Sequence, residues 1–134
     1  MTAAPRSRPK PARRGGPGSR RPGRTLARGG LARIVLATVP DEATGRKVAR
    51  ALVEERLAAC GSVVPIAASV YRWEGRVREE PECLLVLKTR AGRVARLTAR
   101  LLDLHPDEVP EILVIAVDSG LRPYLAWVRA ETAD

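Results

Sequence analysis

The sequence predicts an α+β fold of the ferredoxin-like type, a split βαβ sandwich with the order β-α-β-β-α-β and an added C-terminal helix. Apolar runs typical of buried strands lie at residues 32–39 and 111–117. A long strand pair joined by a tight turn lies between them. Segments with helical periodicity follow the first and third strands, as the crossover connections of this fold require.

The first strand, residues 32–39, is rich in β-branched residues and ends at Pro40. Asp41 suits the N-cap of the following helix, because its carboxylate can accept hydrogen bonds from the free amides of the first turn. The apolar face of this helix continues to about Ala59. Gly61 is the expected C-terminal stop.

A long hairpin joins the second and third strands, at about 62–74 and 81–89. Its turn is predicted at Glu74-Gly75-Arg76. Pro65 has no amide donor, so it marks an edge strand or a bulge. The returning limb is almost wholly apolar at 83–87, which is typical of a strand covered on both faces.

The second helix, residues 90–104, is expected to end at His105, since the residue before a proline disfavours the α conformation. The apolar run 111–117 predicts another central or covered strand. After residues 118–120, apolar residues at helical spacing predict a short terminal helix.

The charge of the chain is concentrated in its first thirty residues. Of the 24 basic residues, nine lie in residues 1–30, which hold no acid, and 15 remain to balance 15 acidic residues in 31–134. We expect residues 1–30 to be a disordered basic tail and residues 31–134 to be one folded domain. The tail composition favours a passive extension over a nucleic-acid contact. Without a signal-peptide or membrane-spanning pattern, the expected location is cytoplasmic.

Several functions found on this fold are disfavoured by missing residue types. An RNA-recognition module needs aromatic residues on its central strands, and residues 83–87 have none. An acylphosphatase-like enzyme would use an asparagine, and the chain has none. A metal-chaperone domain would carry a CxxC motif, whereas Cys60 and Cys83 lie far apart. We therefore expect a protein that is not an enzyme.

The candidate site residues each have two interpretations. His105 is either a helix-terminal imidazole near the last carbonyls or a ligand for a metal such as copper. Glu108 and Glu111 supply oxygen ligands near it or solvate the loop. Tyr71 and Trp73, which share one face of the outgoing strand, line a pocket or pack under a neighbouring element.

Six segments together resemble the CutA divalent-cation tolerance family, in its order and spacing and over about residues 33–129. They read Ala-Thr-Val-Pro-Asp-Glu-Ala-Thr (37–44), Glu-Glu-Arg-Leu-Ala-Ala-Cys (54–60), Ser-Val-Tyr-Arg-Trp-Glu-Gly (69–75), Leu-Lys-Thr (87–89), His-Pro-Asp-Glu-Val-Pro-Glu-Ile (105–112) and Tyr-Leu-Ala-Trp (124–127).

The resemblance implies a trimer-forming ferredoxin-like subunit whose long hairpin and edge strands pair between copies. It implies a role in tolerance of copper and other divalent cations. The alternative that it implies is a trimeric small-molecule sensor like the PII signalling proteins, or an interaction scaffold. The ligand would then lie between subunits, near Tyr71, Trp73, Lys88 and Glu111.

The copper ligands of bacterial family members correspond here to Ala37, Leu104 and His105, so one ligand of three is present. The resemblance therefore implies weak or altered copper binding. Asp107, which follows the His-Pro pair, adds an oxygen donor near His105.

Overall fold

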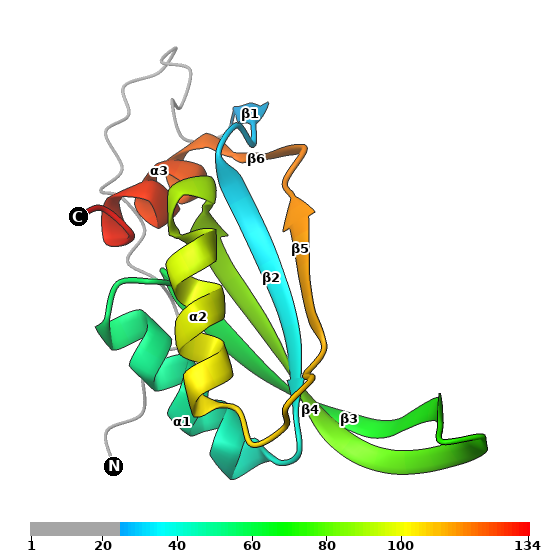
Figure 1. Ribbon diagram of the computed structural model, residues 1–134. Coiled ribbons are helices and arrows are strands. Elements are labelled where there is room, and N and C mark those ends of the chain that lie inside the picture. Colours follow the sequence, from blue (N-terminus) through cyan, green and yellow to red (C-terminus); the bar gives the residue numbers. More distant parts are fainter. Residues whose placement is uncertain (1–24) are drawn as a thin grey trace, which may run out of the picture.

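The computed structural model describes residues 25–134, and their central element is a four-stranded antiparallel sheet (Figure 1). The strand order is β3-β4-β2-β5. The bounds are Ala32–Val39 for β2, Cys60–Trp73 for β3, Arg76–Arg90 for β4 and Ile112–Ala116 for β5. Helices α1 (Glu42–Glu54) and α2 (Val94–Leu104) lie on one face of the sheet. This arrangement confirms the ferredoxin-like α+β prediction.

The N-terminus of α1 is capped as predicted. The Asp41 carboxylate accepts a hydrogen bond of 2.7 Å from the Thr44 amide. The C-terminus of α1 differs from the prediction, because the helix ends at Glu54 rather than near Ala59.

A Schellman motif ends α1, with Arg56 in the left-handed conformation at φ 59°. The Leu57 amide donates to the Leu52 carbonyl at 2.9 Å, and both leucines are buried. Gly61 was wrongly predicted as the stop. It lies in β3, where an added Cβ would come within 3.0 Å of Ala49 on α1. Close packing against the helix explains this glycine.

The cap at Asp41 makes the stability of the protein depend on pH. The hydrogen bonds from Thr44 hold the pKa of the Asp41 carboxyl below its ordinary value of 3.8. The contribution of the charged cap is therefore fully present above pH 3.8 and is lost as pH falls through the lower folded value.

Asp41→Asn keeps a capping oxygen and removes the titrating carboxyl. We expect the wild type to lose more thermal stability than this variant when pH is lowered from 5 to below 3.8. Calorimetric melting of both proteins across this range measures the difference. Melting temperatures that fall by the same amount in both proteins as pH is lowered would contradict the role of the charged cap.

The long hairpin has the predicted turn, edge and bulge. Trp73 pairs with Arg76 across a two-residue turn in which Glu74 and Gly75 have φ values of 51° and 76°. Two consecutive positive φ angles are typical of a type I′ hairpin turn. β3 is an edge strand, and its register shifts between Ile66 and Ser69. The hairpin extends beyond the body of the sheet (Figure 1).

The last strand of the main sheet is not covered as the sequence predicted. β5 is an edge strand bonded to β2 alone in the described part of the chain. Leu113, Val114 and Ile115 expose 54%, 47% and 45% of their surface. The apolar run was interpreted as a strand buried on two faces, and within one chain it is not.

The sheet face opposite the helices has no covering element in residues 25–134 (Figure 1). On β2 and β4 every second residue is buried in the core beneath the helices, and the alternate residues point the other way. The strand pairing places seven apolar residues on this open face. They are Ile34, Leu36, Val64, Leu84, Val86, Leu113 and Ile115. The expectation that residues 83–87 are covered on both faces is therefore met on one face only.

Two short strands that the sequence did not predict lie at the end of the sheet away from the hairpin tip (Figure 1). β1 (Leu26–Arg28) pairs with β6 (Ser119–Leu121), and α3 (Arg122–Glu131) follows directly. Residues 26–28, which the prediction assigned to the tail, form β1 here. Residues 1–24 lie outside the described residues, and their disorder stays a prediction. Within 25–134, every helix is too short or too polar to cross a bilayer.

Candidate functional site

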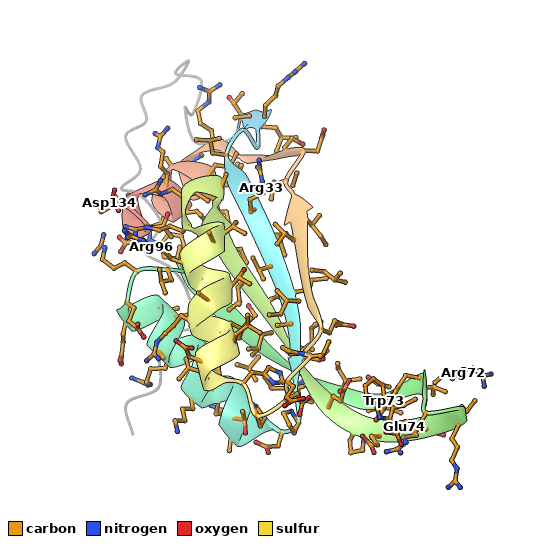
Figure 2. All side chains as sticks on the ribbon, in the orientation of Figure 1. Arg33, Arg72, Trp73, Glu74, Arg96 and Asp134 are labelled. Carbon is orange, nitrogen blue, oxygen red and sulfur yellow. The ribbon has the colours of Figure 1, made fainter. Side chains whose placement is uncertain are left out.

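A groove of about 960 Å³ lies between the hairpin and the loop that joins α2 to β5. We call it the acidic groove. Its hairpin side includes Tyr71 and Trp73, and its loop side is formed by residues 106–111. Tyr71 and Trp73 are alternate residues of β3, so they share one face of the hairpin. They pair with Arg78 and Arg76 of β4. Trp73 lies at the hairpin tip and is 53% exposed (Figure 2).

Negative charge dominates the lining of the acidic groove. Five carboxylates face one arginine, Arg78, which gives a formal charge of −4. The carboxylates belong to Glu80, Glu82, Asp107, Glu108 and Glu111. Clefts lined by charge of one sign concentrate ions of the opposite sign, so this groove attracts cations. The faces of the neighbouring aromatic rings add to that attraction.

One hydrogen bond orders the aromatic wall of the groove. The Tyr71 hydroxyl donates to Oε2 of Glu80 at 2.8 Å. This bond to Glu80 raises the pKa of the Tyr71 phenol, because ionising the phenol would break the bond and place two negative charges together. Tyr71 therefore stays neutral, and Glu80 keeps its second oxygen for other partners.

His105 is buried behind the loop side of the groove, and both of its ring nitrogens have partners. Nε2 lies 2.6 Å from the Thr38 carbonyl oxygen, and the Asp107 amide donates to Nδ1 at 3.0 Å. A carbonyl accepts and an amide donates, so these contacts select the neutral ring with its proton on Nε2. The ring thereby links the loop to β2. His105 could bind a metal only by giving up one of these two hydrogen bonds.

Lys88 does not reach the acidic groove. It lies on the open face of the sheet, opposite Cys60 and Ile34 in the neighbouring strands. Its ammonium group donates to Ser62 Oγ at 2.8 Å and to the Val86 carbonyl at 3.1 Å. The structure therefore brings Tyr71, Trp73 and Glu111 together and places Lys88 elsewhere.

The residues of one chain do not fit a tightly bound metal ion. Within 25–134 there is no group of three or more histidine, cysteine, aspartate or glutamate side chains placed to hold one. Cys83 is 2% exposed, and burial raises the pKa of its thiol, which disfavours the thiolate that binds metals. The acidic groove can attract cations, but within residues 25–134 its carboxylates do not form a group of three placed to hold one ion.

Comparison with known proteins decides the family. The family model described as "CutA1 divalent ion tolerance protein" matches residues 33–131. The chain belongs to the CutA1 family. It is 48% identical over 99 residues to the divalent-cation tolerance protein CutA of Thermus thermophilus, covering 74% of this chain and 96% of that protein. It is 40% identical over 103 residues to human Protein CutA, covering 77% of this chain but 58% of the human protein.

A solved structure agrees with this assignment. The protein described as "PII-like protein CutA" from Nostoc superposes with a TM-score of 0.70 at 40% identity, covering 75% of this chain and 97% of that one. That protein is described as PII-like, in agreement with the architecture that the sequence resemblance implies. The predicted CutA membership is thus confirmed.

The sequence prediction missed the residues of the acidic groove that the returning hairpin strand, β4, supplies. Arg78, Glu80 and Glu82 line it together with Tyr71, yet they lie seven or more residues away from it in sequence. Their alternation along residues 78–82 was a usable signal, since alternate residues of a strand share one face. Using this signal required the register of the hairpin, and the bulge in β3 makes Ile66 the partner of Glu82.

Proposed function

We propose that this CutA1 family member acts in divalent-cation tolerance by binding divalent cations weakly at the acidic groove, without enzymatic activity. The observation that carries the proposal is the formal charge of −4 on the groove lining. The relative from Thermus thermophilus is named a divalent-cation tolerance protein, which agrees with this charge. Carboxylate oxygens suit hard divalent cations, and imidazole suits copper.

Copper binding through His105 is the second part of the proposal. The ring would have to exchange its bond to Thr38 or to Asp107 for the metal. The cost of that exchange, and the lack of two further ligands beside it in residues 25–134, lead us to expect weak copper binding. His105 contributes to copper affinity only if the loop opens locally.

Titration with Mn²⁺ and with Cu²⁺ separates the two parts. We expect Glu108→Gln/Glu111→Gln to weaken the binding of both ions roughly fivefold, because two exposed ion pairs are lost. His105→Gln is expected to weaken Cu²⁺ binding alone. The matched control is Glu54→Gln/Glu131→Gln, which removes the same charge from α1 and α3. Calorimetry at low salt measures the affinities.

Two outcomes would contradict the proposal. An equal loss of Mn²⁺ affinity in the control pair would mean that net charge, rather than the groove, attracts cations. A Cu²⁺ affinity that His105→Gln leaves unchanged would remove His105 from the metal site.

We propose further that the functional form is a homotrimer in which copies cover one another's open face. Seven apolar residues on one sheet face, flanked by Lys88, are more than a monomer ordinarily leaves exposed. β3 and β5 also present free strand edges to a neighbouring copy. In this proposal Lys88 is a subunit-interface residue, and the hairpin reaches an adjacent copy.

A second candidate function, a PII-like small-molecule sensor, is favoured by the size and aromatic wall of the same groove. A volume of about 960 Å³ is sufficient for a small organic ligand. Its charge and the exposed Trp73 ring favour an organic cation. Quenching of tryptophan fluorescence by spermidine in the wild type, absent in Trp73→Phe, would support this function. Equal quenching in both proteins would contradict it.

The cytoplasmic location stays a prediction, which cell fractionation tests directly. So does the passive role of the basic tail. If the tail is passive, residues 25–134 and the full chain will bind DNA equally weakly across a salt series.

A further inference from the structure

A second cavity lies at the opposite end of the sheet from the acidic groove, and arginines line it. It has a volume of about 690 Å³ and is lined by residues of β1, the end of β4 and α3. We call it the arginine pocket. Its basic residues are Arg28, Arg90, Arg122 and Arg129.

The positive charge of the arginine pocket is largely uncompensated. Asp134 is the one acidic residue among the described lining residues, which gives a formal charge of +3. Its carboxylate is already paired with Arg93. Arg90 uses Nε to donate to the Thr132 carbonyl, so its two terminal amino groups remain available.

The other three arginines of the pocket have fewer protein partners than Arg90. Within residues 25–134, the guanidinium groups of Arg28, Arg122 and Arg129 make no hydrogen bond or ion pair with a protein group. A structural role would normally pair such groups with carboxylates or carbonyls, as the neighbouring Arg93 shows. Arginines that line a cavity without protein partners are suited to an anion from outside the chain.

The floor of the arginine pocket is apolar. It is formed by Leu125, Ala126 and Val128 of α3, with Ala27 and Leu31 beside them. A volume of about 690 Å³ lies within the usual range for small-molecule sites. The pocket thus combines an arginine rim for an anionic group with an apolar floor for a carbon skeleton.

We propose that the arginine pocket binds a small organic anion that carries a phosphoryl group. A formal charge of +3 favours a multiply charged phosphate over a single carboxylate. Guanidinium groups donate two parallel hydrogen bonds to phosphate oxygens.

The test is calorimetric titration of the full chain with inorganic pyrophosphate and with phenyl phosphate. Arg122→Gln/Arg129→Gln is expected to weaken both affinities about tenfold or more, since charge-assisted hydrogen bonds are lost. The matched control is Arg46→Gln/Arg50→Gln, which removes the same charge from the exposed surface of α1. We expect the control to stay within about twofold of the wild type. The tail is present in every protein, so its contribution cancels.

Conservative substitution distinguishes a built site from diffuse charge. Arg122→Lys/Arg129→Lys keeps the charge and loses the planar donor fork, so we expect an intermediate loss. Full affinity in this variant, or an equal loss in the α1 control, would overturn the proposal. So would a chain that binds single-stranded DNA but neither small phosphate, because the positive end would then serve a polymer. Unchanged melting temperatures confirm that the exposed substitutions leave the fold intact.

Discussion

Replacing Leu36 with aspartate is expected to convert the proposed trimer into single chains. Leu36 lies at the centre of the open face, between Val86 on β4 and Leu113 on β5. In one chain its side chain is partly exposed, so the subunit can tolerate a carboxylate there. In an assembly the same carboxylate would be buried against apolar side chains without a partner, at a cost of about 3 kcal/mol or more for each subunit.

Sedimentation equilibrium, with far-ultraviolet circular dichroism on the same samples, measures this effect. We expect Leu36→Asp to sediment as a single chain and to keep its secondary structure. The matched control is Leu102→Asp, which charges a leucine that is 46% exposed on α2, on the helical side of the sheet. The control is expected to sediment like the wild type. An assembled Leu36→Asp protein would place the interface elsewhere.

The second large effect is expected at Arg93, which is 6% exposed. Its Nε donates to the Thr132 carbonyl at 2.8 Å, and its terminal amino group pairs with Asp134. Arg90 and Arg56 donate to the same stretch, to the carbonyls of Thr132 and Ala130. These three arginines, which we call the C-terminal clamp, donate to carbonyls at the C-terminal end of α3, where regular helical bonding ends.

Arg93→Ala is expected to lower the free energy of unfolding by about 2–3 kcal/mol, from a lost charge-assisted hydrogen bond and the packing of a buried side chain. Asp134 is exposed, so its loss of a partner adds little. Urea unfolding at one fixed protein concentration measures the change. Arg96→Ala, on the exposed side of α2 (Figure 2), serves as the control and is expected to change it by less than about 0.5 kcal/mol. Equal effects of the two substitutions would contradict the clamp.

Local chemistry made most of the fold predictable. Asp41 fixed the start of α1, the proline after His105 fixed the end of α2, and the glycine at position 75 fixed the hairpin turn. The end of α1 was not predictable in the same way. Arg56 adopts a conformation that ordinarily favours glycine, and its side chain donates to the end of α3, 74 residues away. A long-range contact of this kind leaves no signal at spacings of three or four residues.

The two apolar runs correctly predicted strands but not how those strands are covered. Residues 83–87 and 111–117 were predicted to be covered on both faces, and one chain covers only the helical side. In the proposed trimer this face and the β5 edge are buried against other copies. That burial would account for a covered strand in the prediction and an exposed edge in the single chain.

The candidate site was predictable in part. Tyr71, Trp73 and Glu111 were grouped from a family resemblance, and the structure places all three in the acidic groove. Lys88 was grouped with them, but it lies farther along β4, beyond Leu84 and Val86, so it does not reach the groove.

The mass of the wild-type protein in solution tests the central claim most directly. Sedimentation equilibrium of the full chain at low micromolar concentration is expected to give three times the 14.5 kDa mass of one chain. This is the mass of a trimer in which the three copies cover one another's open face. A mass of 14.5 kDa that does not rise with concentration would contradict the account, because the seven apolar residues of the open face would then be exposed to water.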